Sequence, residues 1–122
     1  MTESDELSAS NLRRAQVNRA ICEFLRDRGE PTPVREVLQY VIDVLPPTPA
    51  EAQVNRRGRM RYDTFIKWAS TVLVQADLIT KKGVQGLWEI TPKGLQALED
   101  YATEVELYQY MLDIALRKRA ER

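Results

Sequence analysis

One short stretch with the two-residue period of β-strands interrupts a chain whose apolar residues otherwise recur at helical spacing. Residues 78–82 (LITKK) and 87–91 (LWEIT) contain β-prone residues, and residues 83–86 (GVQG) form a turn sequence between them. A two-stranded hairpin alone is only marginally stable in water, so helices must cover its apolar face. The sequence therefore predicts a mainly α fold with a small β-hairpin.

Helix signals divide the first half of the chain. A first helix is predicted from Ser10, a suitable N-cap, to Gly29, which stops it. A second is predicted with Thr32 as its N-cap and an end at Pro46, because proline does not continue a helix. Residues 48–51 (TPAE) have the Thr-x-x-Glu form of a capping box, which predicts a short third helix.

A further helix is predicted over residues 61–76, with one apolar and one polar side. Tyr62, Ile66 and Leu73 fall on the apolar side. We interpret Trp68 and Trp88 as packing residues of the core and the hairpin. The polar side carries Asp63, which is also a candidate N-cap, together with Thr64, Lys67, Thr71 and Gln75.

The last helix is predicted to begin at Thr91-Pro92, with Thr91 as N-cap and proline in the first turn. No proline follows Pro92, and apolar positions continue at spacings of three, four or seven residues to Leu116. The pattern predicts one helix of about 25 residues, or ~38 Å at 1.5 Å per residue.

The order of the predicted elements defines a fold class. Three helices closed by a two-stranded hairpin form a winged helix-turn-helix, here followed by a long C-terminal helix. We predict a disordered tail over residues 1–9 and a winged-helix domain over 10–98. Residues 99–122 are expected to continue the C-terminal helix and to serve dimerisation or as a linker.

The residue counts exclude several classes of protein. The chain has 122 residues, no His and one Cys, which excludes Ser-His and Cys-His nucleophile pairs, zinc fingers and disulfide frameworks. No cofactor or metal is expected. No apolar run approaches the ~18 residues of a membrane helix, so no membrane partner is expected. One unpaired Cys, predicted to be buried, suits a cytoplasmic location.

Charge is balanced overall but segregated along the chain. The 18 Lys and Arg residues equal the 18 Asp and Glu residues. Residues 1–55 hold 6 bases and 9 acids, residues 56–94 hold 8 bases and 3 acids, and residues 95–122 hold 4 bases and 6 acids. Positive charge is therefore concentrated in the middle segment, and overall neutrality does not count against binding to a polyanion.

Residues 56–98 contain a family pattern. It consists of Arg57-Gly58-Arg59, Tyr62, Ile66, Trp68-Ala69, Leu73, Ala76, Leu78-Ile79, Gly86-Leu87-Trp88-Glu89-Ile90-Thr91, Gly94 and Leu98. Through these residues the chain resembles the N-terminal winged-helix domain of Mrr-type restriction proteins, over roughly residues 12–98. Family members usually have Gly where Asp77 stands, and Asp tolerates a left-handed backbone better than most residues.

The resemblance implies a DNA-binding module, which in this family is usually fused to a nuclease domain that cuts modified DNA. The chain contains no Glu-x-Lys or Gln-x-Lys core of such nucleases and no phosphate-binding loop. It is therefore expected to be non-catalytic by itself. Two alternatives follow: the DNA-reading part of a restriction enzyme with a fused or separate nuclease domain, or a free-standing regulator of transcription.

Double-stranded DNA is the expected partner, because basic residues occur both before and after the helix predicted over residues 61–76, which is the expected recognition helix. The arginines before this helix are expected to contact phosphates, and its polar residues to contact base edges or phosphates. An ordinary solvated surface would show similar residues. The candidate DNA-binding residues are Arg56, Arg57, Arg59, Arg61, Thr64, Lys67, Thr71, Gln75, Lys81, Lys82 and Gln85.

The C-terminal helix is too long for a domain of about 90 residues to bury its whole apolar stripe. We expect a homodimer through this helix, because two-fold dimers are the commonest assembly. A missing domain is the other candidate partner. The alternative function is a protein-interaction winged helix that does not bind DNA. The predicted dimerisation residues are Tyr101, Val105, Tyr108, Leu112 and Leu116.

Overall fold

The hairpin predicted over residues 78–91 is present, and its strands pair antiparallel. In the computed structural model, which describes residues 7–83 and 86–121, β2 (Ile79–Lys82) pairs with β3 (Leu87–Ile90). A third strand, β1 (Thr32–Pro33), pairs with the other edge of β3 and gives the order β1-β3-β2. This third strand is absent from the sequence-based prediction.

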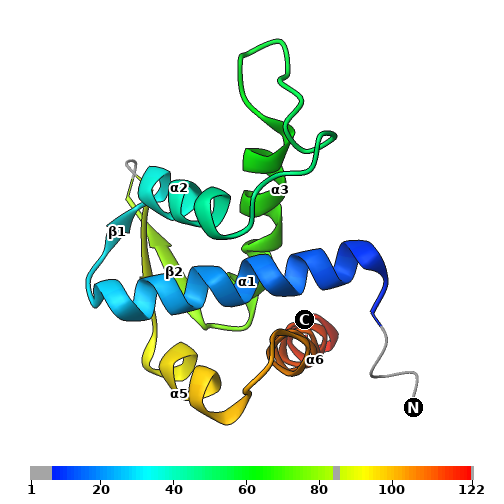
Figure 1. Ribbon diagram of the computed structural model, residues 1–122. Coiled ribbons are helices and arrows are strands. Elements are labelled where there is room, and N and C mark those ends of the chain that lie inside the picture. The colour runs from blue at the N-terminus through cyan, green and yellow to red at the C-terminus, as the bar shows by residue number, and fades with distance from the viewer. Residues whose placement is uncertain (1–6, 84–85, 122) are drawn as a thin grey trace.

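Helices surround this small sheet on several sides (Figure 1). Helix α1 crosses the middle of the molecule, with α2 above it and with α5 and α6 below it. The arrangement is mainly helical and winged-helix-like, as predicted. In the described residues the helices are α1 (Ala9–Arg28), α2 (Val34–Val44), α3 (Arg61–Ala69), α4 (Thr71–Gln75), α5 (Pro92–Asp100) and α6 (Glu104–Ala120).

Helix α1 forms the centre of the hydrophobic core. Its residues Val17, Ile21 and Leu25 are buried, and α6 packs on α1 through Leu107 and Met111, which are also buried. Residues beyond 98 therefore share one core with the preceding elements. Within this core lies Cys22, and burial raises the pKa of its thiol to about 12. The prediction of a buried cysteine is confirmed.

The end of α1 is confirmed, but its predicted beginning is wrong. Gly29 ends the helix in the left-handed conformation, with φ of 68°, and its N–H donates to the carbonyl of Leu25. Ser8 is the N-cap rather than Ser10, and its hydroxyl accepts a hydrogen bond of 3.2 Å from the N–H of Asn11. The helix therefore starts two residues earlier, within the segment predicted as a tail.

Thr32 does not cap α2, which corrects the second helix start. Its backbone belongs to β1, opposite Trp88, and its hydroxyl donates to the carbonyl of Glu30. Helix α2 begins at Val34, whose N–H donates to the carbonyl of Gly86. An extended backbone at Thr32 is favoured here because β3 offers it a strand edge to pair with.

No helix forms at residues 48–51, although their capping box does. The N–H of Thr48 donates to the carboxylate of Glu51, and the N–H of Glu51 donates to the hydroxyl of Thr48. The segment makes a single turn and continues as part of a long loop between α2 and α3, residues 46–60. The carboxylate of Glu51 also binds Arg13, so the box anchors the loop rather than starting a helix.

The helix predicted over residues 61–76 is divided into α3 and α4 at Ser70. The Ser70 hydroxyl donates a 2.6 Å hydrogen bond to the carbonyl of Lys67, and the N–H of Leu73 donates to the carbonyl of Ser70 three residues earlier. Such side-chain bonds and i→i+3 bonds bend helices. Asp77, beyond α4, has φ of 64°, so the left-handed turn expected there is present.

The prediction of one continuous C-terminal helix is wrong. Helix α5 ends at Asp100, and α6 begins after Thr103, whose hydroxyl accepts from the N–H of Glu106 and donates to its carboxylate. Residues 103–106 have the Thr-x-x-Glu form of a capping box, with the Glu106 carboxylate accepting from the Thr103 hydroxyl. Arg19 of α1 holds the intervening turn by donating a 2.6 Å hydrogen bond to the carbonyl of Tyr101.

The junction between the hairpin and α5 has the predicted cap. The hydroxyl of Thr91 accepts from the N–H of Gly94 at 3.0 Å. A methyl group at Gly94 would overlap the carbonyl oxygen of Leu78 and lie 2.7 Å from Ile90. Only glycine allows α5 to approach the sheet this closely. None of the helices in the described residues is long and apolar enough to span a membrane.

Candidate nucleic-acid interface

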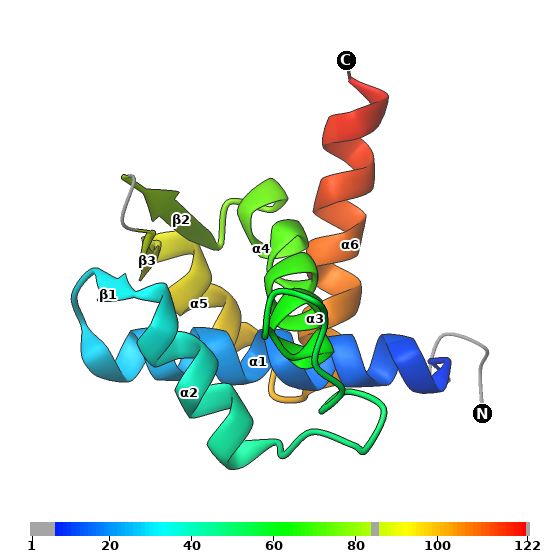
Figure 2. The same cartoon turned by 90° about the horizontal axis from the view of Figure 1, so that it is seen from above.

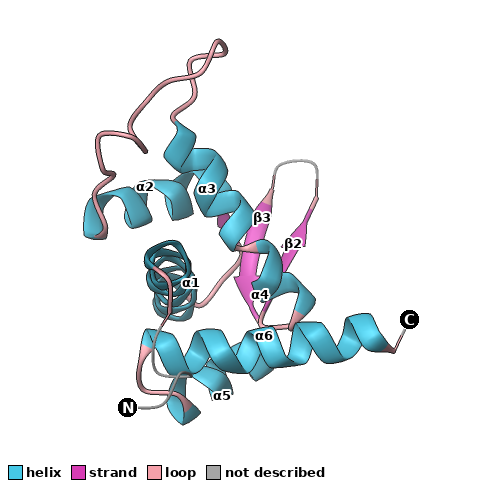
Figure 3. Cartoon of the chain, turned by 90° about the vertical axis from the view of Figure 1, so that its right-hand side faces the viewer, coloured by secondary structure: helices cyan, strands magenta, loops and turns pink. Residues whose placement is uncertain are grey.

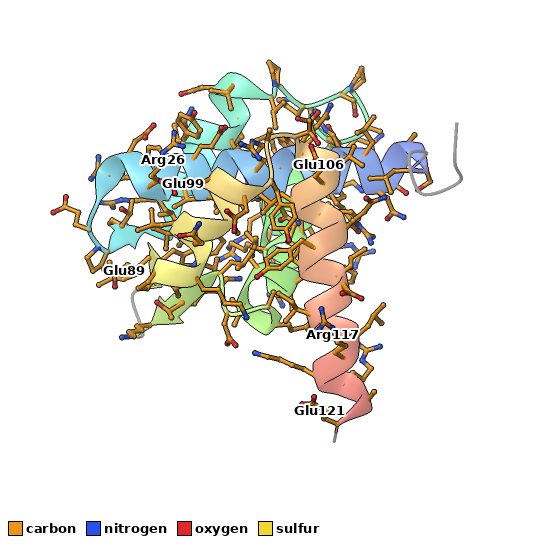
Figure 4. The ribbon with its side chains drawn as sticks, turned by 90° about the horizontal axis from the view of Figure 1, so that it is seen from below. Arg26, Glu89, Glu99, Glu106, Arg117 and Glu121 are labelled. Carbon is orange, nitrogen blue, oxygen red and sulfur yellow. The ribbon has the colours of Figure 1, made fainter. Side chains whose placement is uncertain are left out.

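The 46–60 loop, helix α3 and the hairpin lie toward one side of the molecule. Figure 3 shows the loop and the turn end of the hairpin extending in the same direction on either side of α3. Helices α5 and α6 lie on the opposite side, where Figure 4 shows the labelled carboxylates Glu99 and Glu106 extending from them. The carboxylates of Glu99 and Glu106 thus lie away from the 46–60 loop, although α4 itself packs on α6.

The tip of the loop presents three exposed arginines on a defined backbone. The side-chain oxygen of Asn55 accepts hydrogen bonds from the N–H groups of Arg57 and Arg59, at 2.8 and 3.1 Å. The N–H of Asn55 donates to the carbonyl of Arg59, and Gly58 supplies the left-handed residue of the turn with φ of 78°. Asn55 therefore shapes the segment that carries Arg56, Arg57 and Arg59.

The root of the loop is held to α1 by an ion pair. Arg13 donates two hydrogen bonds to the carboxylate of Glu51, at 2.9 and 3.2 Å, and a third to the carbonyl of Pro46 at 2.8 Å. Its guanidinium also lies over the ring of Tyr62, 5.1 Å from the centroid. The bond to Glu51 raises the pKa of Arg13. Burial opposes ionisation of Glu51, but the hydrogen bonds from Arg13 and Thr48 outweigh it and lower the pKa of Glu51.

The exposed side of α3 and α4 has the predicted polar residues and one unpredicted aromatic residue. Thr64, Thr71 and Gln75 are exposed, and Trp68 lies in the same stripe at a spacing of four, three and four residues. Trp68 is 76% exposed, so its interpretation as a core residue is wrong, whereas Trp88 is buried at 3%. This spacing is visible in the sequence, and it places Trp68 on the same side of the helix as Thr64, Thr71 and Gln75.

The two wing lysines differ in their surroundings. The ammonium of Lys81 donates a 2.6 Å hydrogen bond to the hydroxyl of Ser70 and lies 4.3 Å from the centroid of the Trp88 ring. Burial, and next the charge of Lys67, lower the pKa of Lys81. Lys81 therefore joins the wing to the bend of the recognition helix. Lys82 is exposed, and Gln85 lies outside the described residues.

Two hollows flank Trp68. The first, of about 310 Å³, lies between α3–α4 and α6, and the second, of about 440 Å³, lies between α3 and the loop. Arg14 of α1 lines both, and Arg61, which donates to the side-chain oxygen of Gln53 at 3.2 Å, lines the second. The indole of Trp68 thus forms a shared wall between two concave regions.

The predicted dimerisation residues do not form one free surface. Tyr108 is buried against α1, where its hydroxyl meets the side-chain oxygen of Asn11 at 3.4 Å, and Tyr101 stacks on Tyr110 with centroids 4.5 Å apart. Val105 and Leu112 are partly buried. Leu116 is 60% exposed. The C-terminal end of α6 extends beyond the rest of the molecule (Figure 2).

The end of the recognition helix is connected to α6. An ion pair joins the ammonium of Lys118 to the carboxylate of Asp77, which occupies the left-handed position after α4. This contact adds to the packing of α4 on α6. The ion pair is thus a side-chain contact between α6 and the residue that follows the end of α4 by two positions.

These elements define a winged-helix-like module in which a basic loop precedes two helices, α3 and α4, that meet at a bend at Ser70. The family model of the Mrr N-terminal domain matches residues 15–100, and the chain belongs to this family. No curated protein and no solved structure matches it. The matched region is an N-terminal domain rather than a catalytic one, and it associates the chain with restriction systems. In the described residues, no cluster of three or more His, Cys, Asp or Glu residues has an arrangement suited to a metal ion.

Proposed function

We propose that the chain is a non-catalytic module that binds double-stranded DNA, restriction-related or regulatory. The observation that carries this proposal is which arginines have a carboxylate partner and which do not. In the described part of the chain, the guanidinium groups of Arg56, Arg57 and Arg59 have no carboxylate partner. By contrast, Arg26 pairs with Asp27, Arg28 with Glu36 and Arg117 with Asp113. Three unpaired guanidinium groups on one loop suit a polyanionic partner.

In this proposal the tip of the 46–60 loop, called the arginine loop because it carries Arg56, Arg57 and Arg59, contacts the DNA backbone on one side of the recognition helix. Lys82 contacts the backbone on the other side. Helix α3 faces the major groove, as in helix-turn-helix proteins, and Thr64, Lys67, Thr71 and Gln75 contact base edges or phosphates. Lys81 supports this arrangement through Ser70 rather than through a free ammonium. Gln85 stays a candidate for a minor-groove contact. A fused or separate nuclease domain would supply catalysis.

A protein-interaction module that does not bind DNA is the second candidate function. The exposed Trp68 and Leu116 favour it, because large exposed apolar residues often mark protein contacts. Self-association through α6 also stays a prediction, to be checked by sedimentation equilibrium.

Salt dependence separates the two functions. For the DNA-binding module, mobility shifts of a duplex at rising salt should show an affinity that falls linearly on logarithmic axes. Absence of any shift at low salt would favour the protein-interaction module.

A further inference from the structure

Trp68 is exposed as part of a patch and not in isolation. The first hollow has Trp68 on one wall and Leu112 and Leu116 on the other, with Ala69, Val72, Tyr108 and Ala115 completing its apolar lining. Single exposed apolar residues are common on proteins, but an exposed indole that shares a hollow with an exposed leucine is a candidate binding surface.

The polar residues of this hollow are cationic or neutral. Its lining includes no carboxylate, and it includes Arg14, Arg119, Thr71 and Gln75. Neither guanidinium has an ion pair or hydrogen bond to any residue that the structure describes. The hollow therefore combines an aromatic face, an apolar wall, two side chains that can form hydrogen bonds, and two free positive charges.

The positive charge of this hollow favours an anionic ligand over a second copy of the chain. In a two-fold dimer the same patch faces itself, so a hollow with two arginines and no acid would bring like charges together. An anionic ligand would instead neutralise Arg14 and Arg119. Because Trp68 shares a stripe with Thr64, Thr71 and Gln75 on the proposed recognition helix, the ligand expected at this position is nucleic acid rather than an acidic protein segment.

We propose that this hollow is a binding site for an unpaired nucleobase of DNA. The base stacks on Trp68 opposite Leu116, its polar edge meets Thr71 and Gln75, and the flanking phosphates meet Arg14 and Arg119. Proteins that hold unstacked bases use this combination of an aromatic or apolar clamp, edge contacts and backbone cations. The inference rests on the proposed DNA binding and adds to it a preference for DNA in which a base is unpaired.

The test compares two duplexes of identical sequence, one fully paired and one with a single bulged base in the middle. The full chain should bind the bulged duplex about tenfold more tightly, because stacking of one base on an aromatic side chain supplies an effect of that order. Trp68→Ala should reduce this ratio to about one, and Trp68→Phe should keep part of it. Leu95→Ala is the matched control, because Leu95 is also exposed, at 41%, but lies on α5.

Indole fluorescence gives a direct second measurement. The chain has two tryptophans, and Trp88 is buried, so quenching on addition of the bulged duplex reports mainly on Trp68. We expect stronger quenching by the bulged duplex than by the paired one, and little in Trp68→Ala. Thermal unfolding of each variant establishes that it is folded.

The outcomes are distinguishable. If neither duplex binds at low salt, the proposed DNA binding itself fails. If both bind equally and Trp68→Ala changes neither affinity, only the nucleobase site is overturned. Displacement of the bulged duplex by free dAMP at micromolar concentration would assign the hollow to free nucleotides instead. Self-association that Trp68→Ala abolishes, with unchanged DNA affinity, would assign it to a second copy, and either result contradicts the proposal.

Discussion

The ammonium of Lys81 donates a 2.6 Å hydrogen bond to the hydroxyl of Ser70, which itself donates to the carbonyl of Lys67. This chain of bonds links strand β2 of the wing to the residue at which the recognition helix bends. The wing and the helix are thereby held in a fixed relation, as the proposed contact with a DNA groove requires.

Replacing Lys81, which makes this link, should affect stability and DNA binding differently from replacing its neighbour Lys82. Lys81→Ala should lower the free energy of unfolding by about 1 kcal/mol, because it removes a hydrogen bond and the contact with Trp88. Lys82→Ala should leave urea unfolding nearly unchanged and weaken DNA binding instead. Equal stability of the two variants would contradict the structural role of Lys81.

The arginine loop should contribute to affinity without contributing to sequence preference. Replacing Arg57 and Arg59 by Ala should weaken binding to all duplexes similarly and reduce the slope of log affinity against log salt by about 1 to 2. The control is Arg26→Ala, which removes an exposed arginine that pairs with Asp27. Fluorescence anisotropy with labelled duplexes at several salt concentrations measures both the affinity and its salt dependence. An unchanged slope would rule out phosphate contacts by these arginines.

The Arg13–Glu51 ion pair should make loop anchoring depend on pH. The folded state lowers the pKa of Glu51, so its contribution to stability is present above the ordinary glutamate pKa of about 4.3 and is lost as pH falls through the lower folded value. Glu51→Gln should therefore lower the free energy of unfolding by about 1 kcal/mol at pH 7. The difference from the native chain should disappear in acid.

Urea unfolding at pH 7, 5 and 3 provides the measurement for this ion pair. Glu99→Gln is the control, because Glu99 is exposed on α5 and makes no ion pair with any described residue. A penalty in Glu51→Gln that is the same at all three pH values would show that the charge of Glu51 is not its source.

Gly94 should tolerate alanine less well than Gly29 does. Alanine at Gly94 would place a methyl group against the carbonyl oxygen of Leu78 and force α5 away from the sheet, which should cost about 2 to 3 kcal/mol. Gly29→Ala meets no atom within 4 Å and is strained only by its φ of 68°, which should cost about 1 kcal/mol. Thermal and urea unfolding of both variants compare the two. A smaller loss at Gly94 than at Gly29 would contradict the close packing of α5.

Local signals in the sequence predicted much of the fold. The hairpin follows from alternating residues and a glycine-bounded turn, and the Thr91 cap and the Gly29 stop are chemical features of single residues. The Thr-x-x-Glu pattern at Thr103 to Glu106 is equally local and could have divided the last two helices. Family membership could also be predicted from the sequence, because the residues of the family motif lie in one continuous stretch of the chain.

Two of the errors, at Thr32 and at residues 48–51, occurred where a distant partner decides between two local preferences. Thr32 has the chemistry of an N-cap, but the free edge of β3 pairs with its backbone. Residues 48–51 form a capping box, but Glu51 binds Arg13, which lies 38 residues away in sequence. Most of the candidate DNA-binding residues in the described part of the chain are exposed, and the engagement of Lys81 with Ser70 depends on how the wing packs.

The sequence by itself determined the order of helices and hairpin, the segregation of charge and the family, because these depend on local spacing and on residue type. Only the tertiary structure decided that Tyr108 is buried, that Lys81 supports the recognition helix, and that Trp68 faces a hollow lined by two arginines. The physical reason is that burial and pairing are relations between elements. A helical stripe specifies which residues share a face, but the packing of α6 on α1 decides which faces are covered.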